Sequence, residues 1–135
     1  MSGYTMAVTL DRPYDDVVSQ VKEALADQGF GVLTEIDVRA TMKSKLGVDV
    51  RDQVILGACR PDLAHRAMDA APSVAALLPC NVVVRTTDSQ TVVEVVDPAV
   101  MSRLEDRPEI RAVATEARSG LSAALQALAT STEEG

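Results

Sequence analysis

The sequence predicts an α+β fold, a two-layer sandwich in which helices cover one antiparallel sheet. Three observations predict it. Short β-branched runs of strand length alternate with segments of helical periodicity, two of these runs flank a turn as in a hairpin, and the last helix carries a continuous apolar stripe. Neighbouring strand runs without a long helix between them favour antiparallel pairing. We therefore expect the order β-α-β-β-α-β-β-α in one domain over residues 1–130, with a polar, disordered tail at 131–135.

Three strands are expected in the first half of the chain. Residues 4–10 and 30–36 have strand patterns, and residues 53–59 form an apolar run of strand length. In the third run, a glycine at position 57 indicates a bulge or a close backbone approach. A helix between the first two strands begins near Pro13 and ends at Gly29, because proline suits a first helical turn and glycine the left-handed position after the last turn. The apolar face of this helix consists of Val17, Val18, Val21, Ala24 and Leu25.

The second half of the chain contains a hairpin and the longest helix. Residues 81–87 and 90–96 are β-branched runs on either side of Asp88 and Ser89, which is typical of a hairpin. Residues 108–129 form a helix whose apolar positions recur every three or four residues. These positions are Ile110, Val113, Ala117, Leu121, Ala124, Leu125 and Leu128. Shorter helices are expected at residues 37–46, 61–71, 73–78 and 98–104.

Composition and charge exclude several classes of function. The 135 residues include 19 alanines and 19 valines but only three aromatic residues, so the core is aliphatic and surfaces that stack nucleic-acid bases are excluded. A net charge of −7 argues against a nucleic-acid or anionic-membrane surface, because both need a basic footprint. No run approaches the roughly 18 to 20 apolar residues of a membrane span. The two cysteines, Cys59 and Cys80, are a number typical of a reducing compartment, which favours the cytoplasm.

Both faces of the expected hairpin are apolar. We group Val83, Val93 and Val95 on one face and the other valines of the hairpin on the opposite face. A solvated sheet face would be polar, so a second helix layer or a partner subunit must cover the outer face. A homodimer is favoured, because small chains often complete their burial by two-fold pairing. Glu94 points away from the valines on either side of it, and Arg85 on the other arm is its expected ion-pair partner.

The cysteines and the histidine occur where three segments are expected to meet. Cys59 ends an apolar strand just before Pro61 starts a helix, and the partial positive charge of that helix N-terminus favours a thiolate. His65 lies about one turn further along the same helix. Cys80 begins another strand, with the amide of Asn81 beside it. If the two strands are neighbours, both sulfur atoms lie at one end of the sheet with His65 above them.

Such a cluster permits three kinds of chemistry. Cys59, His65 and Cys80 offer two thiolates and an imidazole, which are suitable ligands for Zn²⁺ or Cu(I). The two thiols can form a disulfide if their Cα atoms lie within about 7 Å of each other. One activated cysteine, with His65 as the base, can act as a nucleophile. The spacing of Cys59, His65 and Cys80 matches no zinc signature. Only Asp62 or Asp69 could supply a fourth ligand.

The same residues also have simpler interpretations. Free cysteine behaves as a small buried hydrophobe, and both cysteines stand in apolar strings, so core packing is the main alternative to chemistry. His65 fits a surface or half-buried position on its short helix. The cations Arg39, Lys43 and Lys45 are either a solvated helix face or a rim that holds an anionic ligand above the Cys59 end of the sheet.

Two segments, ILGACRPDLAH at residues 55–65 and LLPCN at residues 77–81, carry a family resemblance. With them, the chain resembles the prokaryotic domain-of-unknown-function family 302 over residues 4–130. The resemblance implies a small α+β domain with a TATA-binding-protein-like sandwich, usually found as a homodimer, and it implies no established reaction. Two positions depart from the family pattern, since Arg60 stands where an asparagine is common and Gln53 where an aromatic residue is common.

Three classes of function remain open. The first, which we prefer, is a dimeric domain that binds a small ligand or a metal ion, Zn²⁺ or Cu(I). Its site would be lined by Cys59, His65, Cys80 and Asn81, because the two motifs contain the only cysteines and the only histidine of the chain. The second is a thiol-based redox or nucleophilic enzyme that uses Cys59 and Cys80. The third is an interaction or scaffold subunit without chemistry, which the apolar outer face of the hairpin suggests.

Overall fold

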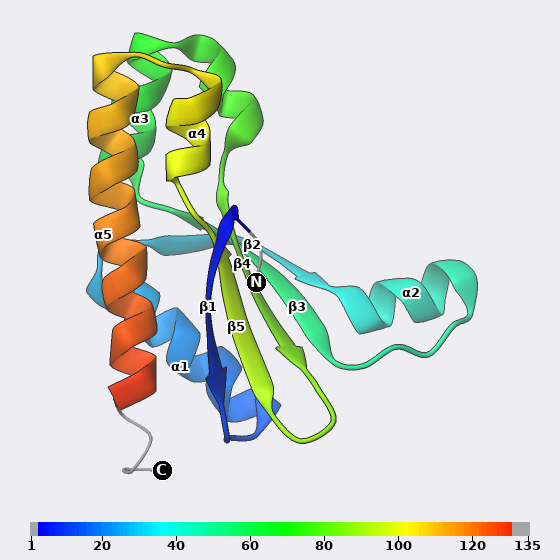
Figure 1. Cartoon of the computed structure of the whole chain (residues 1–135). Coiled ribbons are helices and arrows are strands. Elements are labelled where there is room, and N and C mark those ends of the chain that lie inside the picture. The colour runs from blue at the N-terminus through cyan, green and yellow to red at the C-terminus, as the bar shows by residue number, and fades with distance from the viewer. Residues whose placement is uncertain (1–2, 131–135) are drawn as a thin grey trace.

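The computed structural model describes residues 3–130 and contains a five-stranded antiparallel sheet in the order β1-β5-β4-β3-β2 (Figure 1). The strands are β1 (Thr5–Leu10), β2 (Gly31–Asp37), β3 (Gln53–Cys59), β4 (Cys80–Thr86) and β5 (Thr91–Val96). The helices are α1 (Tyr14–Asp27), α2 (Val38–Leu46), α3 (Pro61–Ala70), the 3-10 helix η1 (Pro72–Leu77), α4 (Ala99–Leu104) and α5 (Pro108–Thr130). The predicted α+β class and the predicted order of the main elements are confirmed.

Helices α1 and α5 form the layer that covers one face of the sheet. They pack against each other, α1 contacts β2 and β4, and α5 contacts β1. Helices α3 and α4 in turn pack against α5, near its N-terminal end in Figure 1. The apolar stripes expected from the sequence supply this layer, since Val17, Val21 and Leu25 of α1 and Ile110 and Leu121 of α5 are buried.

Alternate residues of the central strands complete the core. Leu56 is fully buried in the middle of β3 and pairs with Val82 of β4. Across the hairpin, Val82 pairs with Val95 and Val84 with Val93. All of these side chains belong to the core cluster beneath the helices. The sheet therefore turns one aliphatic face toward α1 and α5, as period-2 alternation requires.

The opposite, outer face of the sheet differs from the expected grouping of valines. Val83 pairs with Glu94, so its predicted grouping with Val93 and Val95 is wrong. Thr86 pairs with Thr91 across the turn, and each pair of the hairpin therefore combines an even-numbered with an odd-numbered residue. The valine pattern alone does not fix that register. The apolar residues of the outer face, which lie outside the core cluster, include Ile55, Val83, Val92 and Val96.

The predicted ion pair between Arg85 and Glu94 is confirmed on this outer face. Arg85 Nη1 donates to Glu94 Oε1 at 2.7 Å, and Thr5 Oγ1 donates to Glu94 Oε2 at 2.6 Å. The hydrogen bond from Thr5 and then the one from Arg85 lower the pKa of the Glu94 carboxyl, because both favour its charged form. The only acidic residue of β4 and β5 is therefore ionised near neutral pH, with one hydrogen bond to each of its carboxylate oxygens.

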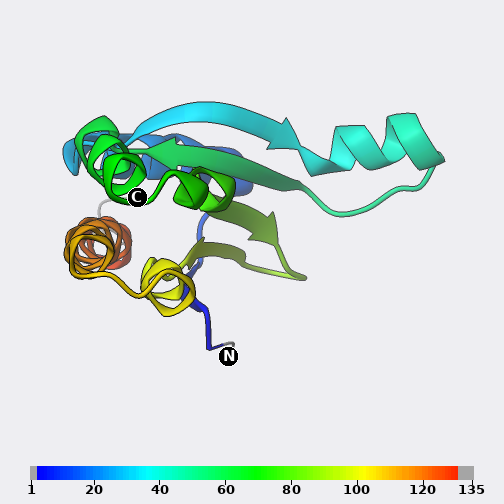
Figure 2. The same ribbon diagram turned by 90° about the horizontal axis from the view of Figure 1, so that it is seen from above.

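Helix α2 and the loop after it extend away from the rest of the molecule (Figure 2). The side chain of Asp37 caps the helix by accepting a hydrogen bond from the Ala40 amide at 2.9 Å. Gly47 ends it in the left-handed conformation, with φ of 69°. None of the residues of α2 is buried. The helix therefore depends on its caps and on surface ion pairs such as Arg39 with Asp52, rather than on core packing.

Helix α5 spans 23 residues and is mostly covered on one side by the core. Across residues 3–130, no helix combines the length and the apolar character that a membrane span requires. The disordered tail that the sequence predicts at residues 131–135 lies outside the described part of the chain.

Candidate functional site

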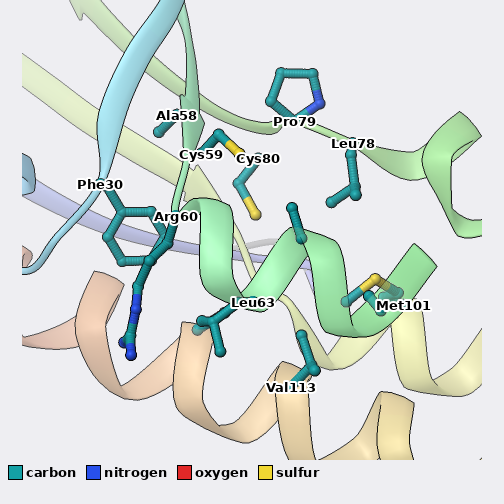
Figure 3. Close-up of a pocket in the computed structure, with 13 residues that line it drawn as sticks. Phe30, Ala58, Cys59, Arg60, Leu63, Leu78, Pro79, Cys80, Met101 and Val113 are labelled. Carbon is teal, nitrogen blue, oxygen red and sulfur yellow. The ribbon is translucent and has the colours of Figure 1, made fainter. Parts of the chain in front are cut away.

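The two cysteines come together because β3 and β4 are neighbours in the sheet. Cys59 is the last residue of β3 and Cys80 is the first of β4. The antiparallel register pairs Cys80 with Ala58, so Cys59 is one residue away from a directly paired position. Both thiols are free, and both line the same cavity at this end of the sheet (Figure 3).

The cavity beside the thiols is small and apolar. Its volume is about 30 Å³, and Leu63 of α3, Met101 of α4 and Val113 of α5 line it together with the two cysteines (Figure 3). Pockets for metabolites measure roughly 300 to 1,000 Å³. A single water molecule needs about 10 to 15 Å³ of cavity volume, so the space suits one ion or one or two water-sized groups. A metabolite does not fit unless side chains move.

Burial keeps both thiols protonated near neutral pH. It raises the pKa of the Cys59 thiol, and it raises the pKa of the Cys80 thiol to about 11, with a smaller contribution from the nearby Cys59. The thiolate that we expected at Cys59 from the adjacent helix N-terminus is therefore a wrong prediction. The amides of Leu63 and Ala64 at that N-terminus both donate to the carbonyl of Arg60, at 3.1 and 3.0 Å, so their partial charge is directed at oxygen.

We expect slow, pH-dependent alkylation that begins at Cys59. Of the two half-buried cysteines, only Cys80 packs against the core cluster, so iodoacetamide should reach Cys59 first. Since the thiolate is the reactive form, the labelling rate should rise about tenfold per pH unit below the thiol pKa. Peptide mass spectrometry after labelling at several pH values measures both sites, with urea-unfolded protein as the control. Rapid labelling of either cysteine in the folded protein at about pH 6 would contradict the raised pKa values.

His65 does not join the two cysteines. Leu63 and Ala67 are buried and turn one face of α3 toward the core. His65 follows Leu63 by two residues, which is about 200° around the helix, and it is exposed on the other side. Within residues 3–130, no group of three histidine, cysteine, aspartate or glutamate side chains is placed to hold a metal ion. The expected three-ligand set of Cys59, His65 and Cys80 is therefore not assembled.

Asn81 also lies away from the cavity. It is exposed and pairs with Gly57 on the outer face, while Cys80 beside it packs against the core, as strand alternation dictates. A Cβ on Gly57 would lie 2.2 Å from Thr34 Oγ1 and 2.8 Å from Pro79 Cγ. The close approach expected at Gly57 is thus confirmed, and it holds Pro79 against the sheet directly before Cys80.

The basic helix lies at the far end of β3 from the cysteines. Helix α2 precedes β3, which then runs through seven residues to Cys59; six residue steps at the usual rise amount to about 20 Å. Arg39 and Lys43 form ion pairs with Asp52 and Asp49, both at 3.3 Å. The idea of a cationic rim above the cysteines is therefore wrong, and these charges belong to a solvated helix face.

The sequence does not predict that Met101 and Arg60 line the cavity. Met101 comes from α4 and adds a thioether to the lining of the cavity, although no spacing relates it to the cysteines. Arg60 also lines the cavity and forms an ion pair with Asp62 at 2.9 Å. That pairing accounts for Asp62, one of the two carboxylates considered as an additional metal ligand.

These features define a class of protein, a small α+β domain with a half-buried pair of thiols at one end of its sheet. The family described as "Domain of unknown function DUF302" matches residues 6–128, and the chain belongs to that family. The crystal structure of an uncharacterized conserved DUF302 protein from Bacillus stearothermophilus is similar to it, with 25% sequence identity and a TM-score of 0.85. The similarity covers 93% of this chain and 98% of that one. No curated protein matches the chain. The resemblance seen in the two motifs is confirmed.

Proposed function

We propose that this domain binds one soft, monovalent metal ion, Cu(I), between Cys59 and Cys80. The observation that carries the proposal is that the only two thiols of the chain line a single cavity of about 30 Å³. A cavity of that size accommodates an ion and excludes a metabolite. Of the two kinds of ligand expected from the sequence, the proposal therefore retains the metal ion and excludes the small organic ligand.

The donor atoms at the cavity favour Cu(I) over Zn²⁺. Thiolate sulfur is a soft ligand, and Met101, whose thioether is also soft, lines the same cavity away from the two cysteines (Figure 3). Zn²⁺ takes four ligands in structural sites, commonly with imidazole among them. Since His65 is exposed, the only imidazole of the chain is not available at the cavity. A sulfur-only site of low coordination number suits Cu(I).

Protonation links this binding to pH. Both thiols have raised pKa values, so a metal ion must displace a proton from each of them. Binding near neutral pH therefore releases two protons, and the apparent affinity rises with pH until the thiols ionise on their own. A pair of thiols that binds Cu(I) must stay reduced, so the proposal goes with a reducing compartment such as the cytoplasm.

An anaerobic competition titration tests the proposal. Reduced protein is titrated with Cu(I) held by a chromophoric chelator, and the transfer of metal is read from the loss of chelator colour. We expect one Cu(I) per chain, together with a higher melting temperature for the loaded protein, because a ligand that binds only the folded state stabilises it. Protein that takes no Cu(I) from the chelator and gains no thermal stability would contradict the proposal.

The homodimer is a proposal of the same kind. It is supported by the outer face of the sheet, where the half-buried residues Ile55, Val83 and Val96 lie outside the core cluster. A second copy that covers this face would remove an apolar surface from water. The native mass tests it, because a dimer has twice the 14.3 kDa of the chain.

A further inference from the structure

The Cα atoms of the two cysteines are close enough for a disulfide. Cys80 pairs with Ala58, and Cys59 is the next residue along β3. Directly paired Cα atoms are about 5 Å apart and successive residues of a strand about 3.3 Å apart, which places the Cα atoms of the two cysteines about 6 Å from each other. The Cα atoms of disulfides lie roughly 4.4 to 6.8 Å apart. Strand alternation directs the Cys59 side chain away from the face that Ala58 and Cys80 share. Because Cys59 is the last residue of β3, the bond closes only if this strand end turns its side chain toward Cys80, in the cavity that both residues line.

The two thiols differ in burial, and this difference determines which of them reacts first. Cys80 packs against the core cluster, whereas Cys59 lies outside it at the end of β3 (Figure 3). An external reagent therefore reacts with Cys59 first, and Cys80 is the neighbouring thiol that reacts second. No other cysteine exists in the chain to compete for the mixed intermediate.

We infer that Cys59 and Cys80 form a reversible intramolecular disulfide by exchange with low-molecular-weight disulfides, with Cys59 as the attacking thiol and Cys80 as the resolving thiol. This activity goes beyond metal binding and requires no metal ion. Disulfide formation affects metal binding only because a closed disulfide has no free thiolate to bind a metal. Oxidation would therefore release bound Cu(I).

The exchange proceeds in two balanced steps. In the first, the Cys59 thiolate attacks a disulfide RS–SR, the Cys59–SR bond forms, and one RS⁻ leaves and takes up a proton. In the second, the Cys80 thiolate attacks Cys59 Sγ, the Cys59–Cys80 bond forms, and the second RS⁻ leaves and is protonated. The chain loses two electrons and two protons, and RS–SR is reduced to two RSH.

Mass spectrometry of reduced, metal-free protein incubated with oxidised glutathione and a chelator tests the inference. We expect the wild-type chain to lose two hydrogen atoms without retaining glutathione, about tenfold faster at pH 8 than at pH 7, because both thiols are protonated at neutral pH. Cys80→Ser should stop at one glutathione on Cys59. Cys59→Ser should react more slowly than Cys80→Ser, because the core shields Cys80. Dithiothreitol should restore the starting mass of the wild-type chain.

Stable glutathione adducts on the wild-type chain, disulfide-linked pairs of chains, or a chain that stays reduced would each overturn the inference. If circular dichroism shows that a serine variant does not fold, the wild-type masses and their pH series still decide the question. Since no copper is present, a negative result here leaves Cu(I) binding standing. A failure of Cu(I) binding likewise leaves the exchange reaction standing.

Discussion

Cys80→Ser should lower the affinity for Cu(I) by more than about 100-fold. Loss of a group that only orients a metal ligand costs about 10- to 100-fold in affinity, and removal of one of two thiolate ligands must exceed this. The hydroxyl of serine is a hard donor and remains protonated at neutral pH, so it does not replace the thiolate. Because Cys59 and Cys80 are proposed to act as a pair, Cys59→Ser should have an effect of the same order. The chelator competition titration measures both variants against the wild type.

His65→Ala is the matched control for the cysteine variants. The imidazole is exposed on the far side of α3, so its removal should leave the Cu(I) affinity unchanged. Asn81→Ala, on the outer face next to Cys80, should behave in the same way. If His65→Ala reduces Cu(I) affinity as strongly as Cys80→Ser does, the metal is held elsewhere or by a different arrangement of α3.

Leu56→Ala should destabilise the fold by about 3 to 4 kcal/mol, within the range for fully buried leucines. Leu56 has 0% exposure and lies in the middle of the sheet, opposite Val82 and beneath the helix layer. Truncation leaves a cavity there, and the surrounding strands fill it only in part. Urea unfolding followed by circular dichroism measures the effect as a lower midpoint with an unchanged slope.

Leu33→Ala provides the comparison for that measurement. Leu33 lies in the edge strand β2 of the same sheet and is 65% exposed, so the same truncation should change the free energy of unfolding by less than about 0.5 kcal/mol. Equal losses of stability in the two variants would mean that β3 does not occupy the centre of the core.

The parts of the fold that follow from local patterns are predictable from the sequence. Apolar periodicity places α1 and α5, and β-branched runs place the strands, because each element must bury one face. The ion pair between Arg85 and Glu94 is predictable for a related reason, since a carboxylate among valines needs a cation within reach. The meeting of Cys59 and Cys80 requires only that their two strands be neighbours.

The parts that depend on rotation, register or packing order are not predictable in this way. His65 fails as a ligand because the buried positions Leu63 and Ala67, and not its distance from Pro61, set the orientation of α3. The predicted grouping of the hairpin valines is wrong because the turn, which pairs Thr86 with Thr91, fixes their register. Met101 lines the cavity only through the packing of α4 on α5.

Reaction of the reduced protein with arsenite, whose As(III) centre is small enough for the cavity, tests most directly whether Cys59 and Cys80 share one site. Trivalent arsenic bridges two thiols only when they lie side by side, and the chain has no other cysteine to supply the second sulfur. We predict one arsenical per folded chain, simultaneous protection of both cysteines from maleimide, and no stable adduct with either single serine variant. Maleimide labelling of the two cysteines that is independent of the arsenical would show that the thiols are apart, and neither Cu(I) binding between them nor the disulfide could then be sustained.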